Sequence, residues 1–113
     1  MTMHTKGPLY VTGKMTRYVE ARIDGGLIQE VAACGPTKAD GGYGPQQEAN
    51  ARLIAAAPDL LEALQWYEAK AVQMRRAAIH QDSKLMLALM KEIAVEHGAK
   101  ARAAIARATG EQP

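Results

Sequence analysis

The stretch from Glu48 to Leu64 is the feature that most constrains the fold, because it combines an apolar helical repeat with an internal proline. Its apolar residues recur at spacings of three and four, which places them on one face of a helix; they are Leu53, Ile54, Ala57, Leu60, Leu61 and Leu64. Proline lacks an amide hydrogen and clashes with the preceding turn, so a helix interior disfavours it. Pro58 therefore predicts either the start of a second helix or a sharp kink between two helical segments.

The residues before this stretch are typical of short strands joined by turns. Three strand candidates follow a polar N-terminal segment; they are Leu9–Thr12, Met15–Ile23 and Leu27–Cys34. Asp24, Gly25 and Gly26 separate the second and third candidates and supply the positive φ angles that tight hairpins need. From Val19 to Ile23 apolar and polar residues alternate, so we expect helices to cover one face of the sheet and water the other.

The residues after Pro58 predict a helix that runs on to about His80. A four-three spacing along it is typical of a narrow helix–helix seam; its positions are Leu60, Leu64, Tyr67, Ala71, Met74 and Ala78. Asp82 or Ser83 could cap a third helix, which would make the long pair an antiparallel hairpin. The alternative is one very long helix, because residues 81–83 contain neither glycine nor proline.

The third helix is expected to present a stripe of apolar side chains to its partner; they are Met86, Met90, Ile93, Ala101, Ile105 and Ala108. Gly98 is expected to end or weaken this helix, because a glycine inside a helix costs about 1 kcal/mol relative to alanine. The sequence after Ala108 is expected to fray.

Together these elements predict an α+β fold, in which a three-stranded antiparallel meander precedes two or three helices and the long pair forms an antiparallel hairpin. The 113 residues predict one domain, with the meander at 1–35, a Gly/Pro-rich loop at 36–45 and the helical part at 46–109. Phenylalanine is absent and alanine is abundant, so the core buries little area for each residue. The monomer is expected to be only marginally stable, and homo-oligomer formation would offset this.

Two segments resemble a largely uncharacterised family of small phage and prophage proteins. His4-Thr5-Lys6-Gly7-Pro8 matches the family's His-Thr-x-Gly-Pro opening, with Leu9 in place of the aromatic residue, usually Trp, that follows it. Residues 48–64, Glu-Ala-Asn-Ala-Arg-Leu-Ile-Ala-Ala-Ala-Pro-Asp-Leu-Leu-Glu-Ala-Leu, are similar to a segment common in these proteins. The resemblance implies a viral origin, and it carries over no catalytic residue.

The segment Gly35–Pro45 is rich in glycine and proline and forms the main predicted loop. It lies just before a helix N-terminus, where unpaired amides and the helix dipole favour an anion. Lys38 could neutralise a phosphate and Tyr43 could stack on a base, so a phosphate or a cyclic nucleotide is the candidate ligand. The segment lacks the Gly-Lys-Ser/Thr pattern of a phosphate loop. The alternative is a plain strand-to-helix connection without a ligand.

Arg75 and Arg76, with Lys70 earlier on the same helix, form a candidate basic patch close in sequence to Trp66 and Tyr67. Such a patch could bind a nucleic acid or an acidic protein surface. The alternative is the solvated face of an amphipathic helix. A second basic run near the C-terminus is also explained by its favourable position relative to the helix dipole; it comprises Lys100, Arg102 and Arg107.

No grouping of residues predicts a metal site, a cofactor or a catalytic centre. His4, His80 and His97 stand far apart in the sequence, and Cys34 has no companion at the spacing of a metal ligand. Glu96 lies beside His97, but neither a nucleophile nor an orienting partner accompanies the pair. We therefore expect a protein that is not an enzyme. The lone cysteine and the absence of a membrane-spanning apolar run predict the host cell cytoplasm.

The resemblance to phage proteins, together with the lack of a catalytic grouping, implies a small, non-enzymatic phage accessory protein that acts by binding. Its partner would be a host defence protein, which makes it an anti-defence inhibitor, or a nucleotide signal that it sequesters. One alternative is a nucleic-acid-binding regulator, although the formal charge of +2 gives this little support. The other alternative is a structural or assembly component of the virion.

Overall fold

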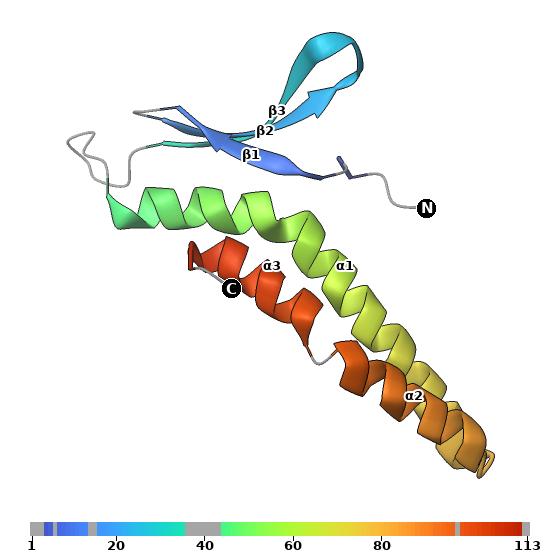
Figure 1. The fold of residues 1–113 in the computed structure, drawn as a ribbon. Helices are drawn as coiled ribbons and strands as arrows, with labels where there is room; N and C mark the ends of the chain where they lie inside the picture. The colour runs from blue at the N-terminus through green and yellow to red at the C-terminus, as the bar shows by residue number, and fades with distance from the viewer. Residues whose placement is uncertain (1–3, 6, 14–15, 36–43, 97, 112–113) are drawn as a thin grey trace.

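The computed structural model describes residues 4–5, 7–13, 16–35, 44–96 and 98–111, and these ranges form three strands and three helices (Figure 1). The strands pair as an antiparallel meander in the order β1-β2-β3. The predicted α+β fold is therefore confirmed, including the hairpin of long helices. In chain order, the elements are β1 (Leu9–Thr12), β2 (Arg17–Ile23), a 3-10 turn (Asp24–Gly26), β3 (Leu27–Cys34), α1 (Pro45–Ile79), α2 (Ser83–Glu96) and α3 (Ala99–Thr109).

The sheet packs on the first part of α1 through small side chains. Ala51 and Ala55 of α1 are buried in the same cluster as Leu9, Val19 and Ala21 of the sheet. Leu9 and Ala21 are cross-strand partners, and the strand period of two places Val19 on the same face as Ala21. The predicted coverage of one sheet face by a helix is confirmed. The fully buried residues that the helix contributes here are alanines, with Ile54 packed at the side, so the sheet lies close to the α1 backbone.

Pro58 lies inside α1, which is continuous over 35 residues. The prediction of a separate helix starting at Pro58 is therefore wrong. Figure 1 shows that α1 changes direction between the part that lies under the sheet and the part that runs along α2, and an internal proline is the common cause of such a bend. This matches the alternative prediction of two helical segments joined by a kink.

The turn between α1 and α2 confirms the predicted hairpin. The backbone N–H of Leu85 donates to Oδ1 of Asp82 at 3.0 Å, which is the capping role expected of this residue. Gly98 separates α2 from α3 and adopts a left-handed backbone with φ of 77°. The predicted third helix therefore ends at Glu96, and the chain resumes as α3 on the side of α1 opposite the sheet (Figure 1).

The buried positions of α1 differ from the predicted seam by one residue. Leu64 is 67% exposed, and Ala71 and Ala78 are also exposed. Ala63 and Ala77, each one position earlier, are buried instead. Interaxial distance depends on the side chains at the contact, and alanine allows the closest approach of two helices. The helices therefore pack along a row of alanines. The other three predicted seam positions, Leu60, Tyr67 and Met74, are partly buried beside this row.

The predicted stripe on the C-terminal helices needs the same correction. Met90 and Ile105 are exposed, although both were expected at the seam. Leu89 and Ala104, again one position earlier, are buried. The other predicted positions of this stripe are partly buried; they are Met86, Ile93, Ala101 and Ala108. The stripe thus lies at the edge of the contact and not at its centre.

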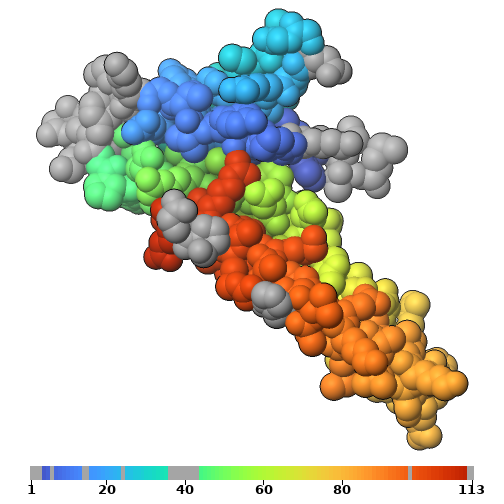
Figure 2. Space-filling model, in the orientation of Figure 1, coloured from blue at the N-terminus to red at the C-terminus, as the bar shows by residue number. Residues whose placement is uncertain are grey.

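The distal part of α1 (residues 64–79) and α2 together form an arm that extends beyond the sheet and α3 (Figures 1 and 2). The principal extents of the molecule are 61 × 33 × 22 Å, which reflects the length of this arm. In the part of the chain that the structure describes, we find no helix with the length and apolar character needed to cross a membrane.

Candidate functional site

The predicted ligand residues Lys38 and Tyr43 lie outside the described residues. The structure does show how the two ends of their loop are joined. The side-chain Nε2 of the buried Gln47, in the first turn of α1, donates to the carbonyl of Cys34 at 2.6 Å. This contact ties the start of α1 to the end of β3, so the loop leaves and re-enters the fold at one place.

Arg75 and Arg76 are exposed on the arm, and the structure does not gather them with Lys70 into one patch. The Nζ of Lys70 contacts a carboxylate oxygen of Glu92 on α2 and lies 5.3 Å from the centre of the Trp66 ring. At about 100° of rotation per residue, Arg75 lies about 140° around α1 from Lys70. Lys70 therefore stabilises the α1–α2 contact, whereas the two arginines face solvent.

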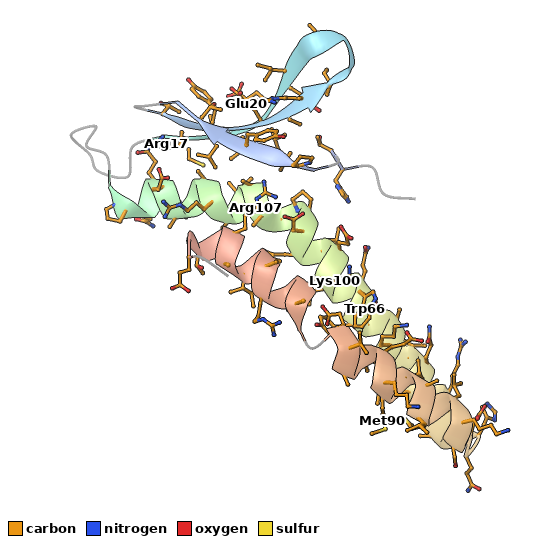
Figure 3. The ribbon with its side chains drawn as sticks, in the orientation of Figure 1. Arg17, Glu20, Trp66, Met90, Lys100 and Arg107 are labelled. Atoms are coloured by element: carbon orange, nitrogen blue, oxygen red, sulfur yellow. The ribbon has the colours of Figure 1, made fainter. Side chains whose placement is uncertain are left out.

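The second basic run is also separated by its contacts. Arg107 donates from Nη1 to Oδ2 of Asp59 at 2.6 Å and from Nη2 to the carbonyl of Leu9. It thereby connects α3 to α1 and to β1 (Figure 3). Lys100 lines a cavity of about 310 Å³ between α1 and α3 that also contains Asp59 and Glu62. Arg107 is thus paired with an acid and Lys100 shares a cavity with two acids, whereas Arg102 is exposed on α3.

A groove between α1 and α2 on the arm, here called the Trp66 groove, is the best candidate for a binding site. It is an open groove with a volume of about 550 Å³, in which the apolar surface of Trp66 and Val95 lies beside three charged residues. Trp66 makes an edge-to-face contact with Tyr67, with ring centres 4.9 Å apart. Val95 is 79% exposed at this groove. The groove is lined by Trp66, Lys91, Glu92, Val95 and Glu96, and Figure 3 shows Trp66 beside α2.

Glu96, at one end of the groove, accepts several hydrogen bonds that fix the start of α3. The backbone N–H groups of Gly98 and Lys100 donate to it at 2.9 and 2.6 Å, and the hydroxyl of Tyr67 donates to the same carboxylate. The Lys100 N–H and then the Tyr67 hydroxyl lower the pKa of Glu96 below its ordinary value of 4.5. The carboxylate raises the pKa of Tyr67 above 10.0 through the same hydrogen bond, and burial adds to this effect.

These two pKa shifts bear on the possibility of acid–base chemistry at residues 96–97. A general acid or base works best when its pKa lies near the working pH. Here both pKa values move away from neutral pH, since that of Glu96 is lowered and that of Tyr67 is raised. Glu96 is therefore held ionised and Tyr67 is held neutral. Glu96 therefore serves as a helix cap, while His97 lies outside the described residues. Within the described ranges, no three His, Cys, Asp or Glu side chains are grouped so that they could hold a metal ion.

Sequence reasoning placed Trp66 and Tyr67 at the margin of a basic patch and missed the groove. The signal that could have found it is the spacing of Trp66 and Lys70, which are one turn apart on the same helix face. The contribution of Val95 and Glu92 depends on where α2 returns along α1, and the sequence does not give that register.

The chain matches a phage protein family, described as Salmonella phage P22 protein Y8K6, over residues 1–112. Because the match covers almost the whole chain, the protein belongs to this family. No curated protein and no solved structure matches it. The resemblance to small phage proteins is thus confirmed at the level of the family, and the match does not test the His-Thr-x-Gly-Pro opening or the 48–64 segment separately.

Proposed function

We propose that this member of the phage P22 Y8K6 family is a non-enzymatic accessory protein that binds a host protein in the host cytoplasm through the Trp66 groove. The observation that carries the proposal is an apolar groove with an aromatic wall on a projecting arm. Its volume of about 550 Å³ is large enough to receive side chains of a partner protein.

The composition of the groove is that of a protein–protein contact. Tryptophan is enriched among the residues that dominate binding energy, and such residues lie in apolar pockets surrounded by polar groups. Trp66 and Val95 supply the apolar surface, and Lys91 and Glu92 supply charges of both signs at the edge. Lys70 holds Trp66 and Glu92 in place, so little conformational freedom remains to be lost on binding.

Two valines on the arm provide a matched pair of variants. Val95 belongs to the Trp66 groove, whereas Val72 is exposed on α1 outside the groove lining. The full-length protein and its Val95→Arg and Val72→Arg variants would be tagged and used for affinity purification from a lysate of the bacterial host. We expect a host protein that is captured by the wild type and by Val72→Arg and is lost with Val95→Arg. Equal capture by both variants would overturn the proposal.

Inhibition of host defence is the specific form of this proposal, and it rests on membership of a phage family. Expression of the protein in cells that carry a defence system should restore phage plating, and expression of Val95→Arg should not. Val72→Arg should restore plating like the wild type. Restoration by Val95→Arg as well would assign the effect to another surface.

The nucleotide-sequestering form depends on Lys38 and Tyr43, and no described contact supports it. It is tested by equilibrium dialysis with cyclic nucleotides, in which Lys38→Ala should weaken binding. A nucleic-acid-binding role is less favoured, since Lys70 and Arg107 are engaged within the protein. Steep salt dependence of binding to DNA or RNA would revive it. High-order self-assembly without a host partner would instead favour a virion component.

A further inference from the structure

A strip along α1, here called the leucine face, is largely exposed to solvent, with only Leu60 partly buried; it comprises Leu53, Ala57, Leu60, Leu61 and Leu64. The two neighbouring faces of this helix are occupied. The sheet covers the face that carries Ala51 and Ala55, and α3 packs on the side of Asp59 and Ala63. Leu53 and Leu64 are left 54% and 67% exposed.

A groove borders the leucine face on the side of the sheet, and is here called the Pro58 groove. It has a volume of about 370 Å³, and its lining is mostly apolar. It shares Ala57 and Leu61 with the leucine face, and its other lining residues are His4, Thr5, Leu9, Val31, Ile54 and Pro58. One continuous surface therefore carries both projecting leucines and a hollow of similar chemistry.

We propose that a second copy of this chain covers the leucine face, and that the projecting leucines of each copy enter the Pro58 groove of the other. A dimer with two-fold symmetry uses the same patch on both copies, so the patch must be complementary to itself. A face that carries projections and a hollow side by side meets this requirement. The four-three spacing of Leu53, Ala57, Leu60 and Leu64 is also that of helices that pack along one another.

The charges around the leucine face favour a second copy over a different partner. A two-fold axis would bring like charges together, and the leucine face carries none. Two charged residues beside it are engaged within the protein, since Arg52 contacts Glu48 at 3.4 Å and Asp59 contacts Arg107 at 2.6 Å, and Glu68 is exposed one turn beyond Leu64. Interfaces of permanent homodimers are more apolar than those of transient complexes, which use charge to select a partner.

The area that a dimer needs indicates how far the contact extends. A stable interface buries about 800 Å² on each partner. The strip from Leu53 to Leu64 is only about 17 Å long at 1.5 Å per residue, so it is too small alone. The β2–β3 hairpin continues the surface past the Pro58 groove, because Ile23, Leu27 and Val31 are exposed on the side of the sheet that faces α1. The proposed contact therefore includes the inner side of this hairpin.

Sedimentation velocity of the full-length protein tests the proposal. Leu64→Arg places a charge on the leucine face, and Leu87→Arg is the matched control, because Leu87 is 54% exposed on α2 away from that face. We expect the wild type and Leu87→Arg to sediment at twice the chain mass of 12.2 kDa. Leu64→Arg should raise the dimer dissociation constant by at least about tenfold. A monomeric wild type, or an unchanged dimer with Leu64→Arg, would overturn the proposal.

Cross-linking keeps the test independent of any effect of Leu64→Arg on folding. Cys34 is the only cysteine, so Cys34→Ser gives a background for single cysteines. Ala57→Cys, near the middle of the leucine face, should form a cross-linked dimer with a short bismaleimide, and Leu87→Cys should not. Failure of Ala57→Cys to cross-link would overturn the proposal, and capture of a host protein by a monomer through Leu64 would assign the face to that partner.

Discussion

Truncation of Leu89 tests the packing of the arm most directly. Leu89 is 1% exposed and is the buried residue of α2 in the described part of the chain. Leu87 lies on the same helix, two residues away, and is 54% exposed. The variants Leu89→Ala and Leu87→Ala therefore remove the same atoms from the same helix and differ in the environment that those atoms leave.

The expected cost follows from burial. A leucine-to-alanine change in a packed site costs about 2–5 kcal/mol, from lost transfer free energy and from the cavity left behind. The arm is only two helices wide, so its walls can relax toward the cavity, and we expect about 2–3 kcal/mol for Leu89→Ala. Leu87→Ala should cost at most about 1 kcal/mol, because the side chain is already half in water. Against a typical stability of about 5–15 kcal/mol, the first loss is large.

The measurement is urea unfolding followed by far-ultraviolet circular dichroism, at one protein concentration because self-association would shift the midpoint. Hydrogen exchange should show that the amides of α2 lose protection in Leu89→Ala before those of the first part of α1. Equal losses of stability for Leu89→Ala and Leu87→Ala would refute the packing described here. A larger loss for Leu87→Ala would place the α1–α2 contact on the opposite side of α2 from Leu89.

Three further changes are predicted to alter stability. Arg107→Met should cost about 1–2 kcal/mol in urea unfolding, because it removes hydrogen bonds to a carboxylate and a backbone carbonyl, while Arg76→Met should be nearly neutral. Gly98→Ala should cost about 1–2 kcal/mol because of its φ of 77°, and Gly35→Ala, with open space around it, should be nearly neutral. Glu96→Gln should lower the melting temperature at pH 7; because the folded pKa of Glu96 is below 4.5, the difference should disappear as the pH falls through that folded value.

The sequence predicted the order and type of the elements because those depend on local patterns. Alternation and an Asp-Gly-Gly turn indicated the hairpin of β2 and β3, and Asp82 indicated the start of α2. Gly98 ended α2 as expected. The effect of Pro58 was harder to predict, because a proline can either begin a helix or bend one. Only the tertiary contacts on both sides of α1 decide between these outcomes.

The candidate site could not be predicted to the same extent. The groove at Trp66 is made by side chains of α1 and α2 that are about 25 to 30 residues apart in sequence. The register between the two helices sets which α2 residues meet Trp66, and small differences in the length of the turn would change it. The roles of Lys70 and Arg107 were missed for the same reason, because a cation with a distant partner looks like a solvated one in the sequence.

On α1 the alanines are packed and most of the leucines are exposed, and the physical cause of this arrangement links the fold to the proposed dimer. Hydrophobic periodicity identifies the stripe with the most apolar surface, and on α1 that stripe is the row of leucines. Alanines, however, permit the closest approach, and α1 is contacted from two sides by the sheet and by α3. Both contacts use the alanine faces, which leaves the leucines outside a monomer with a thin core. A sequence that keeps its largest apolar side chains for the uncovered face of its central helix is best explained by a second layer of protein on that face.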